Sequence, residues 1–330
     1  MPILAKHLAS SALVCLAGLA AAAAQAGDYG VTQRLSLGAE TKWDYAAFDA
    51  ARQRLYVTRG DHVDVIAIPS GAAVGSIPNT QGVHGVAFAP EFNLGFTSNG
   101  KANSITVFDI ESLKPAEEIA LAGKNPDALL YEAGLKQLYV FNGSSASVDV
   151  IDVATRKLVG SLKTAGRPEF AVSDGHGKIY FHLEEHVGGI QVIDTASGKI
   201  AATWALEGCE APTGLAIDAM NSRLFSACHN GLMVVTDANT GRRVAQFPIG
   251  QNPDAVIYDA DTKTVLTSSG GGIGTLNVVN QTDADHYAVR ANVVTEKGAK
   301  TMAMNPLDKT VYLPTAVGNA FVVVVVARAH

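Results

Sequence analysis

Charged and aromatic residues are scarce in this chain of 330 residues. Asp, Glu, Lys and Arg together make up 17% of it and Phe, Trp and Tyr 7%, whereas 48% is hydrophobic. Disordered chains combine low hydrophobicity with high net charge, so this composition excludes a disordered protein. Proline is also sparse, with 12 residues against 32 glycines. A chain rich in Gly, Val, Ala and Thr is typical of closely packed strands joined by tight turns.

Long apolar segments are lacking except at the N-terminus. There, Leu8 to Ala24 follows a short polar start and ends at the small-residue motif Ala24-Gln25-Ala26. This arrangement is typical of a signal peptide, so we expect residues 1–26 to be cleaved before Gly27 and the mature protein to be periplasmic or secreted. No later segment reaches the roughly 20 apolar residues of a membrane-spanning helix, so we expect no membrane span after cleavage.

Basic residues are outnumbered by acidic ones. The chain has 25 Lys and Arg against 31 Asp and Glu, a net charge of −6, and the predicted signal peptide removes one more Lys. General binders of nucleic acid or anionic membranes need a basic face, so this balance disfavours both. We expect a small molecule or a periplasmic protein as the partner, and a monomeric protein.

A repeat of forty-odd residues runs through the mature sequence. Its marker is a short apolar segment whose second residue is aromatic in most copies, as in Leu55-Tyr56-Val57-Thr58 and Leu138-Tyr139-Val140-Phe141. Successive markers are separated by 40, 43, 41, 45, 41 and 46 residues. The seven marker positions are Tyr56, Phe96, Tyr139, Tyr180, Phe225, Leu266 and Tyr312. Seven copies at such a period indicate a propeller, a helical solenoid or an array of domains.

Between the markers, apolar residues alternate with a period of two, which is the pattern of strands and not of helices. The clearest repeat contains four such segments, which are Pro126–Tyr131, Gln137–Asn142, Ser147–Asp152 and Lys157–Leu162. Short segments separated by Gly, Asn, Asp and Thr turns are typical of all-β proteins. Four strands in each of seven repeats predict an all-β, seven-bladed β-propeller that occupies residues 27–330 as a single domain.

The two ends of the chain are predicted to share a blade. The final repeat, from Lys300, ends after its third strand, Phe321–Val326, whereas Val31–Gly38 resembles a fourth strand yet precedes the first repeat. We therefore expect Val31–Gly38 to complete the last blade, so that no open sheet edge is left where the ends meet.

Asp recurs directly before the turn between the third and fourth strands. A carboxylate at this place can accept hydrogen bonds from the backbone N–H groups of the turn. We assign this structural role, and no catalytic one, to Asp109, Asp152, Asp194 and Asp237.

The mature chain contains two cysteines, Cys209 and Cys228. A cysteine pair in an exported protein is a candidate for a disulfide. In a hairpin that turns near Asn221, residue 228 lies opposite about residue 213, so the connecting loop can bring Cys209 to it. We predict a disulfide between the two.

The Leu-Tyr-Val-Thr marker, third strands that end in Val-Ile-Asp and turns of the Thr-Gly-Lys type resemble the YVTN-repeat β-propellers, in particular the YncE-like exported bacterial proteins. The resemblance covers residues 43–330 and the closing strand. It implies the same seven-bladed fold, whereas most members have no assigned function. Relatives in the wider seven-bladed class include lactone hydrolases, and single-stranded DNA binding is associated with YncE.

In a propeller, the loops before the innermost strands open on one face of the central channel. The residues at that position are Asp44, His84, Asp127, Glu169, Thr213, Asp254 and Thr301. Carboxylates that converge in a ring are costly unless they bind a cation, share protons or meet basic partners. A divalent metal ion is thus a candidate cofactor, with Asp127, Glu169 and His84 as candidate ligands. The alternative is that each Asp caps its own turn.

A second set of polar residues follows or ends the second strands, and it consists of Arg59, Asn99, Asn142, His182, His229 and Ser269. We predict a ligand-binding mouth formed by Asp44, Arg59, His84, Asn99, Asp127, Asn142, Glu169, His182, His229 and Asp254. A lactonase-like hydrolase stays open as an alternative, in which a carboxylate or His activates water and Arg59 or a bound cation stabilises the oxyanion. Its catalytic residues stay unassigned, and we expect a binding role before an enzymatic one.

The sequence contains two further patterns that bear on function. Arg59, Lys101, Lys124 and Arg167 would supply a local basic patch for single-stranded DNA binding. The segment His182-Leu183-Glu184-Glu185-His186 matches the H-x-x-E-H pattern of inverted zinc peptidases, which needs a helix to bring its histidines together. Because this segment continues a predicted strand, along which four residues span about 13 Å, we reject the peptidase.

Overall fold

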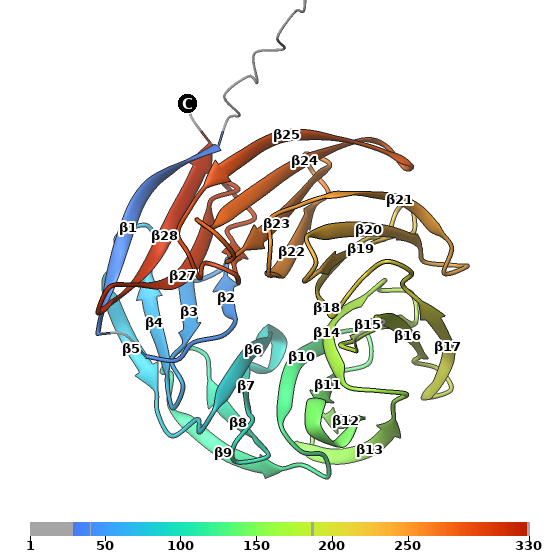
Figure 1. Ribbon diagram of the computed structural model, residues 1–330. Coiled ribbons are helices and arrows are strands. Elements are labelled where there is room, and N and C mark those ends of the chain that lie inside the picture. Colours follow the sequence, from blue (N-terminus) through green and yellow to red (C-terminus); the bar gives the residue numbers. More distant parts are fainter. Residues whose placement is uncertain (1–28, 40, 186–187, 329–330) are drawn as a thin grey trace, which may run out of the picture.

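The structure, a computed structural model, describes residues 29–39, 41–185 and 188–328. They form seven four-stranded antiparallel sheets arranged around a central channel (Figure 1). This confirms the predicted seven-bladed β-propeller. The predicted signal peptide, residues 1–26, lies outside the described residues. Among the residues that are described, none belongs to a helix long and apolar enough to cross a membrane.

Six blades are built from consecutive strands, and the seventh combines both ends of the chain. The first three blades consist of β2 (Ala46–Asp49), β3 (Arg54–Thr58), β4 (Val63–Ala67) and β5 (Ala73–Ile77); β6 (Val83–Ala89), β7 (Leu94–Asn99), β8 (Ser104–Asp109) and β9 (Pro115–Ala120); and β10 (Pro126–Glu132), β11 (Gln137–Asn142), β12 (Ser147–Asp152) and β13 (Lys157–Lys163). Two short 3-10 helices, η1 (Pro90–Phe92) and η2 (Gly143–Ser145), lie in the second and third of these blades.

The remaining blades follow the same plan. They consist of β14 (Pro168–Ser173), β15 (Lys178–Leu183), β16 (Gly189–Asp194) and β17 (Lys199–Ala205); β18 (Pro212–Asp218), β19 (Arg223–Cys228), β20 (Leu232–Asp237) and β21 (Arg243–Pro248); β22 (Pro253–Asp259), β23 (Thr264–Ser269), β24 (Thr275–Asp283) and β25 (His286–Val294); and β26 (Ala303–Met304), β27 (Val311–Val317) and β28 (Ala320–Arg328) with β1 (Tyr29–Ala39).

The closing strand is confirmed. β1 is the outermost strand of the last blade and pairs antiparallel with β28, with Val31 opposite Val326 and Leu35 opposite Val323. Both ends of the described chain therefore lie side by side (Figure 1). Arg59 fixes this junction, because its guanidinium donates to the carbonyl oxygens of Leu37 at 3.0 Å and Ala39 at 2.7 Å.

The core is divided into seven clusters, each of which fills the space between two neighbouring blades. Tyr56 of the first blade packs against Phe108 of the second, with ring centroids 6.1 Å apart. Phe141 and Phe181 join the third and fourth blades at 5.3 Å. Burying a large apolar side chain contributes about 1.5–3 kcal/mol, so every blade is held by both of its neighbours. The loops at the channel mouth are thus carried on a rigid ring.

The predicted turn role of the third-strand Asp residues is also confirmed. Each of these carboxylates accepts a hydrogen bond from a backbone N–H group three residues further along the turn. The pairs are Asp109 with Ser112 at 2.7 Å, Asp152 with Thr155 at 2.8 Å, Asp194 with Ser197 at 2.7 Å and Asp237 with Thr240 at 3.0 Å.

The innermost strands line the channel, and one glycine allows two of them to meet. A Cβ atom on Gly214 of β18 would lie 2.7 Å from the backbone of Ala255 on β22. Below the mouth, the channel holds a cavity of about 120 Å³ lined by apolar groups that include Tyr45, Phe170 and Met302. Polar groups are therefore concentrated above this apolar layer.

Candidate functional site

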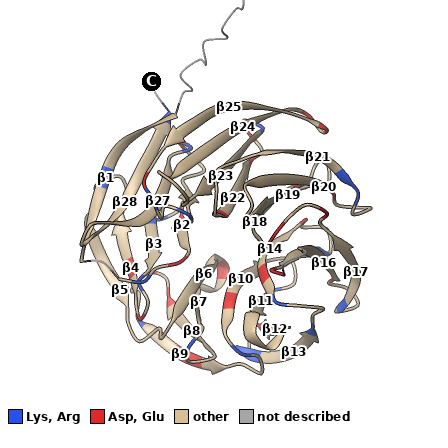
Figure 2. Ribbon diagram, viewed as in Figure 1, with Lys and Arg blue, Asp and Glu red and all other residues tan. Residues whose placement is uncertain are grey.

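The residues that open the blades gather at one mouth of the channel. Acidic residues on β10 and β14 lie beside the central opening in Figure 2. Short polar contacts link residues of the sixth, seventh, first, second, third and fourth blades in turn. The predicted convergence of Asp44, His84, Asp127, Glu169 and Asp254 is therefore present in the fold.

Asp44, His84 and Asp127 form the tightest group. Nδ1 of His84 lies 2.6 Å from Oδ2 of Asp44 and 3.6 Å from Oδ1 of Asp127. The three residues come from three successive blades, and each offers one atom to a group whose members all lie within 4.8 Å of one another. Two carboxylates and an imidazole in this arrangement can hold a proton or a cation between them.

Glu169 continues the cluster on the fourth blade. Its Oε1 accepts a hydrogen bond from the hydroxyl of Tyr45 at 2.8 Å. Arg167 lies between the acids, with Nη2 at 3.8 Å from Asp127 and 4.0 Å from Glu169, and its Nε is 3.1 Å from Glu184. One guanidinium is thus shared by three carboxylates.

Lys300 closes the cluster on the other side. Its ammonium group pairs with Asp254 and lies 4.0 Å from Oδ1 of Asp44. The Oδ1 atom of Asp127 and the Oε2 atom of Glu169 are buried and have no hydrogen-bond partner among the described residues. The Asp254 carboxylate of the sixth blade is thus paired with a residue of the neighbouring seventh blade, whereas Asp127 and Glu169 each keep one oxygen without a hydrogen bond in the described part of the chain.

Burial dominates the titration of the acids at the mouth. Burial raises the pKa of Asp127 to about 7, with the charges of Asp44 and Asp254 adding to the rise and His84 and Arg167 opposing it. Burial, followed by the charge of Asp127, raises the pKa of Glu169 well above its usual range. The protonated forms of these acids are favoured, as expected for carboxyl groups that are poorly solvated.

For the basic groups at the mouth, neighbouring negative charges outweigh burial. Burial favours a lower pKa for His84, but the hydrogen bond to Asp44 and the charges of Asp127 and Asp44 outweigh it, so the pKa is raised. Burial of Lys300 is likewise outweighed by the charges of Asp254 and Asp44, and its pKa is raised. The mouth therefore stabilises positive charge.

A pocket of about 530 Å³ opens beside the cluster, between the first two blades. Its lining includes Asp44 and His84 from the ring, Trp43 and two lysines, Lys42 and Lys101. It thus offers hydrogen-bonding groups of both charge signs and one aromatic surface. This combination is typical of a site for a small polar ligand.

The second predicted set does not form a ring of exposed groups. Asn99, Asn142 and Ser269 are fully buried, and Asn99 donates to Thr106 at 2.8 Å. Arg59 lines the pocket, but its guanidinium is only 4% exposed, pairs with Asp64 at 2.8 Å and stacks on Phe321. These side chains connect strands within a blade or between blades.

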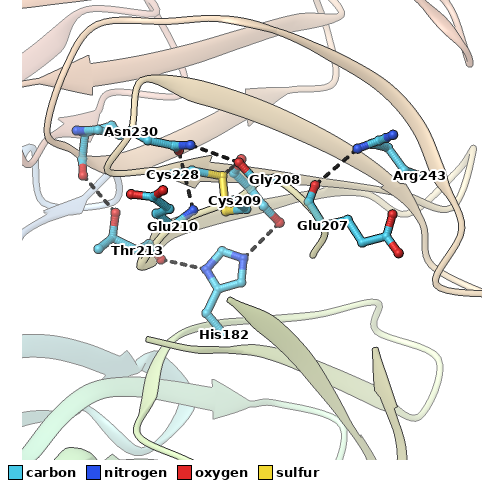
Figure 3. The surroundings of a disulfide bond; sticks show 11 residues. His182, Glu207, Gly208, Cys209, Glu210, Thr213, Cys228, Asn230 and Arg243 are labelled. Carbon is cyan, nitrogen blue, oxygen red and sulfur yellow. Dashed lines mark hydrogen bonds between the residues drawn. A yellow bond between two sulfur atoms is a disulfide. The ribbon is translucent and has the colours of Figure 1, made fainter. Parts of the chain in front are cut away.

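His182 is fully buried and does not line the mouth pocket. It is 0% exposed, and its ring nitrogens lie 2.9 Å from the carbonyl oxygen of Thr213 and 2.8 Å from Oγ of Ser226 (Figure 3). Burial lowers its pKa to about 4. Relative to the repeat marker it sits one residue earlier than Asn99 and Asn142, and a shift of one residue along a strand turns a side chain to the other face.

The predicted disulfide between Cys209 and Cys228 is confirmed. The sulfur atoms are 2.02 Å apart, and the bond lies beside His182 and Thr213 (Figure 3). Cys228 pairs with Pro212, one position away from the expected residue 213, because an irregularity between Pro212 and Leu215 shifts the register of β18. This side of the mouth is therefore cross-linked.

His229 and the basic residues have separate places. His229 is partly exposed, beyond the end of β19. Burial raises the pKa of the nearby Asp254, and the charge of Lys300 opposes this rise. Of the four basic residues that would form a patch for DNA binding, Arg59 and Arg167 pair with carboxylates, while Lys101 and Lys124 are exposed at the mouth.

The first two residues of the H-x-x-E-H segment, His182 and Leu183, lie in β15, and its last residue lies outside the described part of the chain.

Sequence reasoning missed Tyr45 and Lys300 and did not assign Arg167 to the carboxylate cluster. A signal existed for each. Tyr45 directly follows Asp44, Lys300 directly precedes Thr301, and Arg167 stands two residues before Glu169, where Asn125 stands before Asp127. Aligning positions around each opening residue would have placed all three at the mouth.

Comparison with known proteins identifies distant relatives. No family model matches the chain. It is 27% identical over 191 residues to the uncharacterized protein YncE of Salmonella typhi, and the match to YncE of Salmonella typhimurium is the same. The aligned region covers 56% of this chain and 52% of YncE. It is also 27% identical over 135 residues to antigen Lp49 of Leptospira interrogans, covering 39% of this chain and 30% of that protein. The chain spans about half the length of YncE, of which it is a distant homologue.

Solved structures resemble the whole propeller. A chain of the hydrazine synthase of Kuenenia stuttgartiensis superposes with a TM-score of 0.74 at 16% identity, covering 85% of this chain and 94% of that one. A chain of a mitotic checkpoint complex superposes with a TM-score of 0.77 at 13% identity and covers 98% of each. At such low identity the similarity shows the fold alone.

Proposed function

We propose that this protein binds a small polar molecule in the pocket at the channel mouth. The observation that carries the proposal is the convergence of five carboxylates on two permanent cations beside a pocket of about 530 Å³. The carboxylates are Asp44, Asp127, Glu169, Glu184 and Asp254, and the cations are Arg167 and Lys300.

The chemistry of the lining indicates the class of ligand. Lys42 and Lys101 can donate hydrogen bonds, Asp44 and Asp61 can accept them, and Trp43 offers an aromatic surface. Hydroxylated molecules such as sugars and lactones carry donors, acceptors and an apolar ring face. They match this mixture better than a purely anionic or purely apolar ligand does. The rigid ring of blades presents the groups without a large rearrangement, which lowers the entropy cost of binding.

A thermal-shift screen with small sugars, sugar acids and lactones tests the proposal. A ligand that binds only the folded state raises the melting temperature. We expect at least one compound to do so, and Lys101→Ala to reduce the shift at least severalfold. Lys199→Ala, at an exposed lysine that begins β17 away from the pocket, is the matched control and should leave the shift unchanged. A shift that survives Lys101→Ala and Asp61→Asn would place the ligand elsewhere.

A second candidate function is hydrolysis of a lactone at the same pocket. It is favoured by the hydrogen bond of 2.6 Å between Asp44 and His84, because a carboxylate that orients an imidazole is a recurring arrangement for activating water. In this reaction His84 would take a proton from water as the water oxygen attacks the lactone carbonyl. His84 would then give that proton to the ring oxygen as the C–O bond breaks, so that the product is the open hydroxy acid. Turnover on a lactone panel that is abolished in His84→Gln would support hydrolysis, and binding without turnover would support the binding role alone.

We also propose that residues 1–26 direct export and that the mature protein works in the periplasm. The disulfide between Cys209 and Cys228 supports this, because such bonds persist in oxidising compartments. N-terminal sequencing of the protein from a periplasmic extract should begin at Gly27. Recovery of the uncleaved chain in the cytoplasmic fraction would contradict the proposal.

A further inference from the structure

We infer that Asp44, His84 and Asp127 bind a divalent transition-metal ion, for which zinc is the probe we choose. The inference rests on the proposed function and deepens it, because the ion would face the mouth pocket and supply a contact for the ligand. Imidazole together with carboxylate oxygens is a donor set that suits transition metals better than calcium or magnesium.

The geometry of the three residues fits one ion. Zinc binds nitrogen and oxygen donors at about 2.0–2.2 Å, so the donors of a tetrahedral site lie about 3.4 Å apart. In the structure, Nδ1 of His84 is 2.6 Å from Asp44 and 3.6 Å from Asp127, and one donor atom from each residue falls within 4.8 Å of the others. Small side-chain movements would therefore bring the three donors around a common ion.

A buried and unpaired oxygen is the independent sign of a missing partner. Asp127 is only 3% exposed, and its Oδ1, the atom that faces His84, has no hydrogen-bond partner among the described residues. A buried carboxylate is costly unless it is paired, hydrogen-bonded or coordinated to a metal. The nearest permanent cation, Arg167, lies 3.8 Å from the other oxygen of Asp127 and also serves Glu169 and Glu184.

The charge of the cluster points the same way. Among the described residues, five carboxyl groups lie near only two permanent cations, so acidic groups outnumber the fixed positive charges at this mouth. A divalent ion held between Asp44 and Asp127 would contact an oxygen of each.

The backbone around the three residues is fixed in advance. Thr301 donates to the carbonyl oxygen of Asp44 at 2.7 Å, and Ser98 bridges the backbone of Gly85 at 2.9 Å and that of Asp127 at 2.5 Å. A Cβ atom on Gly100 would lie 2.6 Å from Nε2 of His84, so glycine leaves the space that the imidazole occupies. Such outer contacts orient the ligands of metal sites.

The site is open on one side. The side chains of Asp44 and His84 are 19% and 27% exposed, and both line the mouth pocket. Three protein ligands with free positions toward a pocket are typical of metal sites that bind substrate or water, whereas structural sites are closed by four ligands. The free positions would meet an oxygen of the ligand.

Calorimetric titration of zinc into the mature protein, with any histidine tag removed and the sample first treated with EDTA and dialysed, tests the inference. We expect one zinc ion per chain, and at least tenfold weaker binding in both His84→Gln and Asp127→Asn. Asp61→Asn, at an exposed acid on the rim of the same pocket, is the matched control and should bind zinc like the wild type. Circular dichroism confirms that each variant is folded.

Two outcomes would overturn the metal site. One is the absence of zinc binding, and the other is binding that is equal in His84→Gln, Asp127→Asn and the wild type. Preferential binding of calcium over zinc would also contradict a transition-metal site. The proposed binding function is tested separately. A sugar or lactone that raises the melting temperature in EDTA, together with the absence of zinc binding, would support the pocket and overturn the metal site. Zinc binding with no response to the ligand panel would support the metal site alone.

Discussion

Two histidines, one on the second blade and one on the fourth, show how differently two blades of the propeller use the same kind of residue. His84 lies between Asp44 and Asp127 at the edge of an open pocket, and His182 lies between the backbone of Thr213 and Ser226 with no exposed surface. Burial favours a lower pKa for both, but only His84 has carboxylates that reverse the effect. The first to third blades thus form an open side of the mouth, and the fourth and fifth blades form a sealed side.

The sealed side owes its rigidity to satisfied hydrogen bonds and a covalent link. Both nitrogens of His182 are used, and the disulfide between Cys209 and Cys228 lies next to it (Figure 3). The open side keeps an unpaired buried oxygen on Asp127. Binding sites are commonly less stable than the rest of a fold, so the comparison predicts larger losses of stability from changes on the sealed side than from changes on the open side.

The largest effect is expected from His182→Ala. The change removes two buried hydrogen bonds and leaves a cavity, so the free energy of unfolding should fall by about 3 kcal/mol or more. His84→Ala should cost less than half as much, because His84 is partly solvated. Urea denaturation of both variants measures the difference, and equal losses would erase the distinction between the two sides.

Removing the disulfide should cost a similar amount. The cysteines are separated by 19 residues, and closing a loop of this size stabilises a protein by about 3 kcal/mol. The double variant Cys209→Ala, Cys228→Ala should therefore unfold at lower urea concentration than the wild type. An unchanged midpoint would mean that the sealed side does not depend on the link.

Lowering the pH should weaken the sealed side through His182. Its pKa is about 4 in the folded state and about 6.5 when unfolded, so the unfolded chain takes up the proton first. The stabilising contribution is complete above pH 6.5 and is lost as the pH falls toward 4, by about 3 kcal/mol in total. His182→Gln should have a flatter pH profile over this window than the wild type. Identical profiles would contradict a neutral buried His182.

The smallest effect is expected on the open side and has the opposite sign. Asp127→Asn replaces a buried, incompletely paired carboxylate with a neutral group, so in EDTA the free energy of unfolding should rise by about 1 kcal/mol. Denaturation at pH 8 measures this change. A loss of stability would show that Asp127 serves the fold and not a ligand.

The repeat made the fold predictable. The four strands of the third blade begin where the alternation predicts, at Pro126, Gln137, Ser147 and Lys157, because turn residues and apolar periodicity are local signals. The closing strand and the disulfide also followed from the count of strands and the position in the repeat. Each of these predictions needed only the order of residues along the chain.

The details of the site needed the neighbouring blades as well. Glu169 appeared to be a metal ligand, but the structure groups Asp44 with His84 and Asp127, and Glu169 faces Tyr45 instead. Which carboxylate turns toward the imidazole depends on side-chain packing between blades, which the spacing of repeats does not encode. The burial of His182 likewise depends on Ser226, 44 residues away.

X-ray diffraction from crystals of the mature protein soaked in zinc, recorded on both sides of the zinc absorption edge, tests the open side most directly. We expect an anomalous difference peak about 2.0–2.2 Å from His84 and from carboxylate oxygens of Asp44 and Asp127. A peak bound only at other residues, or a mouth in which His84 keeps its contact with Asp44 and no ion is present at saturating zinc, would contradict the account.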